Sequence, residues 1–224
     1  MKRYQQYCPI AHALGAIGER WSLLIVRDLL RGPRRYTDLA EGLGIGTNVL
    51  ASRLRDLEQA GLVTRRKLPP PASTVTVYEL TDYGRDLEEA LQALARWGAR
   101  TLGPPGPEDE IEPGWSLDAL RAMFDRDAAR GVNAVYELRI DAEQTTARVA
   151  DGALVEVRSG PAEEPDLLLE TDMATFYGLL VRTISPWDAL ADGRVRIEGA
   201  AAELERLLGI FNLESRSVAL PTPA

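Results

Sequence analysis

The segment Arg34–Leu80 constrains this chain more than any other, because it places two short amphipathic stretches and two β-branched stretches in a fixed order. It reads RRYTDLAEGLGIGTNVLASRLRDLEQAGLVTRRKLPPPASTVTVYEL. Thr37 is a favourable N-cap for a helix to about Leu43, and Gly44-Ile45-Gly46 predicts a turn. Thr47 predicts the cap of a second helix to about Ala60, which Gly61 ends. The segment therefore begins as a helix-turn-helix.

The second of these helices has two different faces. At about 100° per residue, its leucines fall on one face, which carries Leu50, Leu54 and Leu57. The opposite face is polar and carries Asn48, Ser52, Arg55 and Gln59. Side chains of this kind hydrogen-bond base edges in a DNA major groove, although any surface helix also presents a polar outward face.

Two stretches with alternating β-branched residues follow, 62–68 and 74–80, and a proline-rich tip separates them. They predict a β-hairpin, and Arg65, Arg66 and Lys67 lead to its tip. These three residues are either a solvated strand edge or a wing that neutralises phosphate. Because side chains alternate along a strand, either Arg66 or its two neighbours would face DNA. The whole segment predicts a winged helix-turn-helix.

Helices are expected on both sides of this segment. Pro9 suits a first helical turn, and the apolar spacing predicts helices over about 9–17 and 20–30. Thr81 is expected to cap a longer helix, whose apolar stripe consists of Tyr83, Leu87, Leu91, Leu94 and Trp97. The N-terminal helices, of the same chain or of a second copy, are the segments available to cover this stripe. We therefore expect a homodimer formed through these helices.

Charge divides the chain unevenly. Residues 1–100 contain 15 Lys+Arg and 11 Asp+Glu, a balance of +4, whereas residues 101–224 contain 11 and 23, a balance of −12; the total is −8. The proline-rich acidic segment 103–114 predicts a linker between a DNA-binding and dimerisation domain, 1–102, and a second domain, 115–224. The acidic half is expected to lie away from DNA, because it repels a polyanion.

The second half predicts an α+β domain, in which strands in a row are followed by helices. Strands are expected over 132–140, 145–149, 153–158, 166–171 and 194–198, with Asp151-Gly152 as a tight hairpin turn. Helices are expected over 116–127, 173–182 and 200–211, with a short one after Pro186. The large apolar residues of this half are either core or the lining of a ligand pocket; they are Met123, Phe124, Phe176, Tyr177, Leu180, Ile184, Trp187 and Phe211.

Few residues of this chain suit catalysis. His12 is the only histidine and Cys8 the only cysteine, so neither a metal site nor a nucleophile–base pair is expected, and no cofactor is implied. Cys8 is either a partly buried small side chain or a redox-reactive thiol, because a helix N-terminus favours the thiolate.

No apolar run approaches the ~20 residues of a membrane span, and the N-terminus does not resemble a signal peptide. We therefore expect a cytoplasmic protein.

Residues 8–98 resemble the HxlR family of winged-helix transcriptional regulators. The resemblance is carried by ordered blocks, namely Cys8-Pro9-Ile10, GERWSLLI at 18–25, GPRRY at 32–36, NVLASRL at 48–54, LEQAGLV at 57–63 and YELTDYG at 78–84. Gly44-Ile45-Gly46-Thr47 departs from the proline or serine that often leads into the second helix of this family. The resemblance implies DNA binding, and some members of the family are redox sensors at the cysteine that corresponds to Cys8.

Residues 115–213 are similar to the sterol-carrier-protein-2 (SCP2) fold. The similarity is carried by ADGRVRIEG at 191–199, by the terminal helix that ends at Phe211 and by TDMATF at 171–176. That family encloses an apolar tunnel for lipid-like ligands, so the similarity implies a cavity in this half.

We therefore predict a homodimeric DNA-binding transcriptional regulator, repressor or activator, that an apolar small molecule bound in the C-terminal domain modulates. Contacts with double-stranded DNA are expected from residues of the winged domain, namely Arg34, Arg35, Tyr36, Thr37, Thr47, Asn48, Ser52, Arg53, Arg55, Arg65, Arg66 and Lys67. The alternative is a carrier of lipid-like ligands whose helical half serves only for dimerisation. An enzyme is not expected.

Overall fold

The structure, a computed structural model, describes residues 4–69, 71, 74–103, 105–106, 109 and 114–212. Its internal contacts divide the chain into two compact units, Met1–Leu91 and Gln92–Ala224. Each unit has its own hydrophobic core. Most of the predicted linker 103–114 and part of the predicted hairpin tip lie outside the described residues. None of the helices in the described ranges is long and apolar enough to cross a membrane.

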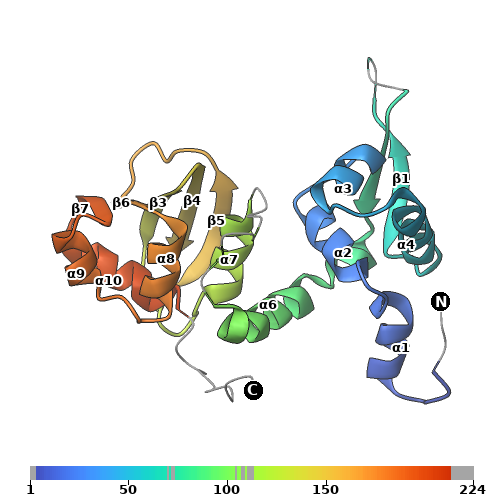
Figure 1. The fold of residues 1–224 in the computed structure, drawn as a ribbon, viewed down its shortest axis with the longest axis horizontal. Coiled ribbons are helices and arrows are strands. Elements are labelled where there is room, and N and C mark those ends of the chain that lie inside the picture. The colour runs from blue at the N-terminus through green and yellow to red at the C-terminus, as the bar shows by residue number, and fades with distance from the viewer. Residues whose placement is uncertain are drawn as a thin grey trace. The chain divides into compact units, whose positions relative to one another are not determined.

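The first unit is a small helical domain with a two-stranded ribbon (Figure 1). Its elements are α1 (Pro9–Ile17), α2 (Ser22–Leu30), α3 (Tyr36–Gly42), α4 (Thr47–Gln59), β1 (Val63–Lys67), β2 (Thr76–Leu80), α5 (Asp82–Arg85) and the start of α6 (Glu88–Leu102). The apolar faces of α2, α3 and α4 meet in one core, in which Ile25, Leu29 and Leu39 are buried together with the three leucines of α4.

Two predicted helix caps in this unit are wrong by one or two residues. The helix expected to start at Thr37 begins at Tyr36 with Arg35 as its N-cap, because the Arg35 amide donates a hydrogen bond to the Asp38 carboxylate. The helix expected to be capped by Thr47 includes Thr47 as its first residue, and Gly46 is the N-cap.

The single long helix expected after Thr81 is in fact two helices, α5 and α6. The Thr81 hydroxyl accepts a hydrogen bond from the Gly84 amide and donates one to the Gly61 carbonyl, 2.6 Å away, so α5 is held against the start of β1. Gly84 lies so close to the strand that a Cβ there would be 2.1 Å from the Leu62 carbonyl oxygen. The helix ends at Arg85 and resumes in a second segment.

The predicted apolar stripe is divided by this break. Leu87 and Leu91 pack against the core of the first unit. Tyr83, Leu94 and Trp97 are 61%, 47% and 67% exposed. The later part of the stripe is therefore uncovered within a single chain.

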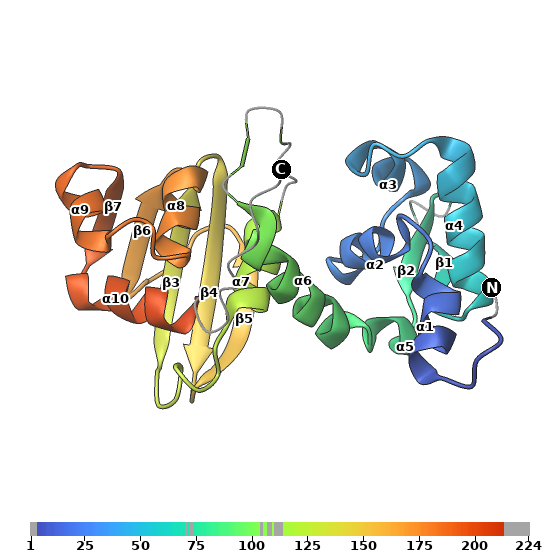
Figure 2. The same cartoon turned by 60° about the horizontal axis from the view of Figure 1, so that its bottom comes forward.

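The second unit is built on a five-stranded sheet (Figure 2). Its remaining elements are α7 (Trp115–Met123), β3 (Ala134–Ile140), β4 (Glu143–Ala150), β5 (Ala153–Ser159), β6 (Leu167–Thr171), α8 (Met173–Leu180), α9 (Pro186–Ala191), β7 (Val195–Gly199) and α10 (Ala201–Ile210). The strand order is β5-β4-β3-β6-β7, in which β3 and β6 are parallel and the other neighbours antiparallel. Asp151 and Gly152 have φ of 50° and 75°, which suits the predicted tight hairpin turn.

The helices of the second unit pack on one face of this sheet (Figures 1 and 2). Tyr136, Leu138 and Ile140 of β3 point into that core, where they meet apolar side chains of α7, α8 and α10. The intervening residues of the strands form the other face, which is polar. The predicted α+β class is confirmed: a helical helix-turn-helix region precedes a mixed sheet covered by helices.

Candidate nucleic-acid interface

The helix-turn-helix is formed by α3, the four-residue turn 43–46 and α4. Leu43 and Ile45 of the turn are buried, and Gly44 between them has φ of 57°, a conformation that suits glycine. Leu50, Leu54 and Leu57 are buried at 1% exposure or less, so the orientation of α4 is fixed by its apolar face.

The predicted base-reading residues lie on the outward side of α4. Asn48 and Arg55 are exposed and Ser52 is half-buried, one turn apart along the same face. The Arg55 Nε donates a hydrogen bond to the Ala51 carbonyl at 3.2 Å, which aligns the side chain with the helix. The face is free of intramolecular ion pairs among the described residues and presents both donors and acceptors, as major-groove readout requires.

The wing is the antiparallel pair β1 and β2, with Val63 opposite Leu80 and Lys67 opposite Thr76. Arg34 extends it as a third short strand: its amide donates to the Tyr78 carbonyl at 3.0 Å, and its carbonyl accepts from the Tyr78 amide at 2.7 Å. Arg34 and Arg35 are therefore exposed beside the wing, at the N-terminal end of α3. Thr37 and Thr47 are exposed in the first turns of α3 and α4.

The three basic residues of β1 have different surroundings. The Arg65 Nε lies 2.6 Å from a carboxylate oxygen of Glu58 on α4. The Arg66 Nε donates to both carboxylate oxygens of Glu79 on β2, each at 3.0 Å. Lys67 is exposed and makes no ion pair with the described residues. The wing is therefore less basic than its sequence indicates.

Two tyrosines lie between the wing and the helix-turn-helix. The Tyr36 hydroxyl donates a 2.5 Å hydrogen bond to the Thr47 carbonyl at the start of α4. Burial raises the pKa of the Tyr78 hydroxyl, against the opposing effect of the positive charge of Arg65, which lies directly opposite Tyr78 on the neighbouring strand. Tyr36, predicted as a DNA contact, thus uses its hydroxyl to hold α4.

Arg53 was also predicted to contact DNA, but its guanidinium is directed into the protein. It donates to the Arg20 carbonyl at 3.1 Å, to Asp56 at 2.9 Å and to Glu19 at 3.0 Å, and its side chain is only 19% exposed. These bonds attach α4 to the segment between α1 and α2.

Sequence reasoning did not identify the carboxylates that occupy these arginines. Glu58 stands seven residues before Arg65, across a helix end, and no local spacing rule pairs the two. The partner of Arg66 could have been predicted. In the predicted hairpin, Glu79 falls on the neighbouring strand, diagonal to Arg66, at a distance that allows a cross-strand ion pair.

Cys8 lies at the N-cap position of α1 and is half-buried, and its carbonyl accepts the His12 amide. Its predicted redox role stays a prediction, which the alkylation rate of the thiol would test. Among the described residues no group of His, Cys, Asp and Glu is arranged to hold a metal ion.

Half of the predicted ligand-binding residues are core residues of the second unit. Met123, Phe176, Leu180 and Phe211 are at most 5% exposed. Phe124 is half-buried, with its ring 5.7 Å from that of Phe211. Tyr177 and Ile184 are half-buried, and Trp187 on α9 is 47% exposed.

One polar group lies in the middle of this core. Tyr136 is fully buried between the sheet and α10. Burial raises the pKa of its hydroxyl far above the ordinary value, and the Glu203 carboxylate on α10 raises it further. The hydroxyl therefore stays neutral.

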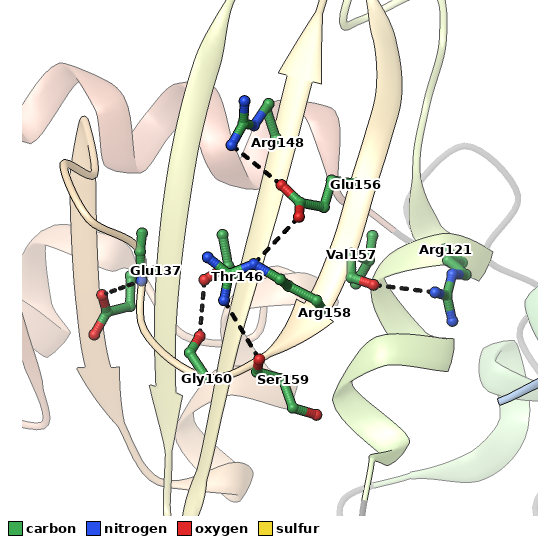
Figure 3. A network of polar contacts seen from close by, with 10 residues as sticks. Arg121, Glu137, Thr146, Arg148, Glu156, Val157, Arg158, Ser159 and Gly160 are labelled. Carbon is green, nitrogen blue, oxygen red and sulfur yellow. Dashed lines mark hydrogen bonds and ion pairs between the residues drawn. The ribbon is translucent and has the colours of Figure 1, made fainter. Parts of the chain in front are cut away.

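The opposite face of the sheet carries a network of charged side chains (Figure 3). The carboxylate of Glu156 on β5 forms ion pairs with Arg148 of β4 and Arg158 of β5, with nitrogen–oxygen distances of 3.2 Å in both. The segment after β5 folds back over this face, since the Thr146 hydroxyl donates to the Gly160 carbonyl at 2.8 Å.

Glu137 of β3 lies beneath that segment and is 2% exposed. Its carboxylate accepts hydrogen bonds from Gln144 at 2.7 Å, from Arg139 at 2.8 Å and from the Ala162 amide at 2.9 Å. Burial acts to raise the pKa of this carboxyl, but the three hydrogen bonds outweigh burial and the pKa is lowered. The face is therefore a set of satisfied ion pairs.

Comparison with known families assigns each half of the chain. Residues 16–105 match the family described as HxlR-like helix-turn-helix, and residues 109–223 match the family described as alkyl sulfatase C-terminal. The predicted resemblance of the first half is thereby confirmed, while the match to the second half carries a different description from the SCP2 fold.

Individual proteins are similar to one half or the other. An uncharacterized HTH-type transcriptional regulator of Mycobacterium tuberculosis is 42% identical over 99 residues, which are 44% of this chain and 62% of the relative. The HTH-type transcriptional regulator YodB of Bacillus subtilis is 34% identical over 99 residues, which are 43% of this chain and 88% of the relative. The solved sec-alkylsulfatase Pisa1 from Pseudomonas sp. is 19% identical with a TM-score of 0.42, and the match covers 46% of this chain and 16% of that one.

Proposed function

The chain belongs to the HxlR-like helix-turn-helix family, and its C-terminal half belongs to the alkyl sulfatase C-terminal family. We propose that it is a transcriptional regulator that binds double-stranded DNA in a sequence-specific manner. The observation that carries this proposal is the outward face of α4. Asn48, Ser52 and Arg55 are accessible there while the leucines of the other face are buried. The contacts divide into base readout by α4 and phosphate contacts around it.

The proposed phosphate contacts come from exposed groups around α4. Lys67 and Arg66 belong to the wing, and Arg34 and Arg35 lie at the start of α3, where the helix N-terminus also attracts an anion. Thr37 and Thr47 add hydroxyl donors at the two helix starts. Arg53 and Tyr36 are assigned a different role, because their polar groups already hold α4 to the rest of the domain.

A second copy of the chain completes the DNA-binding unit. One short recognition helix reads too few base pairs to select a site in a genome, and a two-fold dimer doubles the site. Ile10 and Leu14 on α1 are 71% and 46% exposed, and the exposed part of the α6 stripe is also apolar. We assign these surfaces to the dimer interface.

The second unit is assigned the role of an effector module for an apolar ligand. The similarity to the SCP2 fold supports this role. So does the position of Phe124, Tyr177 and Ile184, which pack only partly against the core. The neutral Tyr136 hydroxyl is the polar group that a ligand between sheet and α10 would meet. A ligand alters DNA binding only if it binds the DNA-free and DNA-bound forms with different affinity.

A mobility-shift titration tests the DNA proposal. The DNA upstream of the protein's own gene is compared with a random duplex, with salt varied. Arg55→Ala is expected to reduce the preference for the specific duplex by about tenfold, because one bidentate base contact discriminates by ~1–3 kcal/mol. Arg66→Ala is expected to weaken binding to both duplexes alike. Equal losses on both duplexes for Arg55→Ala would contradict its base-reading role.

Native mass spectrometry of the purified protein tests the effector role and the carrier alternative together. A co-purifying apolar molecule is expected to be bound by the second unit and to change the affinity for DNA. A bound lipid in a chain that binds no DNA would instead support the carrier, whose helical half serves only for dimerisation.

A further inference from the structure

A continuous set of polar contacts connects the two ends of α4 through the wing. At the C-terminal end, Glu58 binds Arg65 of β1, and Arg65 lies directly opposite Tyr78 of β2. At the N-terminal end, Tyr36 binds the Thr47 carbonyl. The main chain of Arg34, two residues before Tyr36, is bonded to that of Tyr78.

From this set we infer that Arg65 is a positioning residue, which together with Glu58 holds the wing at a fixed place beside the recognition helix and does not contact phosphate. The inference rests on the proposed DNA-binding function. It assigns different roles to three neighbouring basic residues: Arg65 positions the wing, Arg66 exchanges an internal carboxylate for phosphate, and Lys67 meets phosphate directly.

The strand geometry separates Arg65 from Arg66, while Lys67 shares the side of Arg65 but lies two residues closer to the hairpin tip. Val63 and Arg65 point to the same side of β1 as Tyr78 and Leu80 of β2, and Val63 and Leu80 are 3% exposed in the core against α4. Arg65 therefore extends along the core side of the ribbon, toward Glu58. Arg66 lies on the opposite side of the strand and reaches Glu79 within the hairpin.

The elements that each ion pair joins point the same way. The exposure of the two carboxylates does not distinguish them, since the side chains of Glu58 and Glu79 are 21% and 22% exposed. Glu58 belongs to α4, so its pair with Arg65 joins the wing to the proposed recognition helix, whereas the pair of Arg66 with Glu79 lies within the wing. Loss of the Glu58–Arg65 pair therefore changes how the wing is held against α4.

The two readings of Arg65 predict opposite effects for a single substitution. If Arg65 contacts phosphate, Glu58 competes with the DNA, and Glu58→Gln would raise the affinity for every duplex. If Arg65 positions the wing, Glu58→Gln loosens the wing and lowers the affinity for the selected sequence. Glu79→Gln is the matched control, because it also removes one carboxylate charge paired with a wing arginine, at a pair that we assign to exchange with phosphate.

The experiment measures binding of the full chain by fluorescence anisotropy, over a series of salt concentrations. The duplexes are one that the wild-type protein selects from a random pool and one unselected duplex. Glu58→Gln and Arg65→Ala are each expected to lower the affinity for the selected duplex by about two- to fivefold, the range of exposed ion pairs, with the salt dependence unchanged. The double variant is expected to lose no more than either single variant.

Two control variants test the sign of the change in DNA affinity and the slope of that affinity against salt concentration. Glu79→Gln is expected to raise the affinity for both duplexes, and Lys67→Ala to reduce the slope of log affinity against log salt by about 0.9, one phosphate contact. A rise in affinity for both duplexes in Glu58→Gln, or a loss of slope in Arg65→Ala equal to that in Lys67→Ala, would overturn the inference.

A DNA-free measurement separates this inference from the proposed function. Hydrogen exchange of the peptide 62–68 is expected to be about two- to fivefold faster in Glu58→Gln and in Arg65→Ala, and unchanged in Lys67→Ala. If the wild-type protein selects no sequence from the random pool, the DNA-binding proposal is refuted but the positioning role of Arg65 is not. Unchanged wing exchange in both variants would refute the positioning role, whatever the protein binds.

Discussion

Glu137 shows how much one residue of the second unit depends on its surroundings. Its carboxylate is buried on the face of the sheet shown in Figure 3. It accepts hydrogen bonds from three donors on three segments. A glutamine at this position would turn an NH₂ group toward those donors. The ionised form is therefore the one that the fold requires.

We expect Glu137→Gln to lower the free energy of unfolding by about 2 kcal/mol near pH 7, the scale of hydrogen bonds to a charged group. The lowered pKa means that the stabilisation is present above the unfolded-state value of 4.5 and is lost as the pH falls through the folded-state pKa. Urea unfolding followed by tryptophan fluorescence at several pH values would measure both effects. The difference between variant and wild type should shrink below about pH 4.5.

Glu156→Gln is the control for this prediction, because Glu156 accepts arginines on the same face but is 36% exposed. A change of less than about 0.5 kcal/mol is expected there, as for other surface ion pairs. Equal effects of the two substitutions would show that burial of Glu137 contributes nothing.

At the scale of elements, the sequence predicted the helices and strands well and their junctions less well. Periodicity located α4, the hairpin and all five strands of the sheet, because apolar spacing reflects the face that each element buries. The break between α5 and α6 was missed, since it depends on the approach of Gly84 to β1, a contact between elements. The outward polar face of α4 followed from its own spacing, whereas the partners of Arg53 and Arg65 lie on other elements and left no local signal.

This junction gives a prediction about α5. Gly84→Ala is expected to cost about 2 kcal/mol of unfolding free energy, because its Cβ would overlap the Leu62 carbonyl and the strand would have to shift. Gly98→Ala on α6 meets no atom within 4 Å and is expected to stabilise the helix by up to about 1 kcal/mol. Thermal unfolding of both variants checks the pair, and a neutral Gly84→Ala would disprove the close packing of α5.

For the whole molecule, the division of charge predicted from the sequence agrees with a basic DNA-reading domain and an acidic partner domain. The two families match on either side of residues 105–109, close to the predicted linker. The ligand of the second unit could not be predicted, because the same large apolar residues serve as core or as pocket lining. Four of the eight candidates are core residues.

The oligomeric state is a property of the whole molecule and gives the last prediction. The double variant Leu94→Ser/Trp97→Ser should shift the proposed dimer to monomer at micromolar concentration, because it removes the exposed apolar part of the α6 stripe. Sedimentation velocity over a concentration series measures the change. Val155→Ser, at an exposed valine on β5, should leave the dimer intact; a dimer unaffected by the double variant would assign the interface elsewhere.

The ion pair between Arg66 and Glu79 has a consequence inside a cell. A genome offers about 10⁶–10⁹ non-specific sites that compete for every regulator molecule. In the proposed function, a wing whose arginine already has an internal carboxylate gains less from any stretch of phosphates, whether that stretch is the selected site or a competing one. Because this loss is the same for both kinds of site, the preference for one sequence would depend on the base contacts of α4 alone.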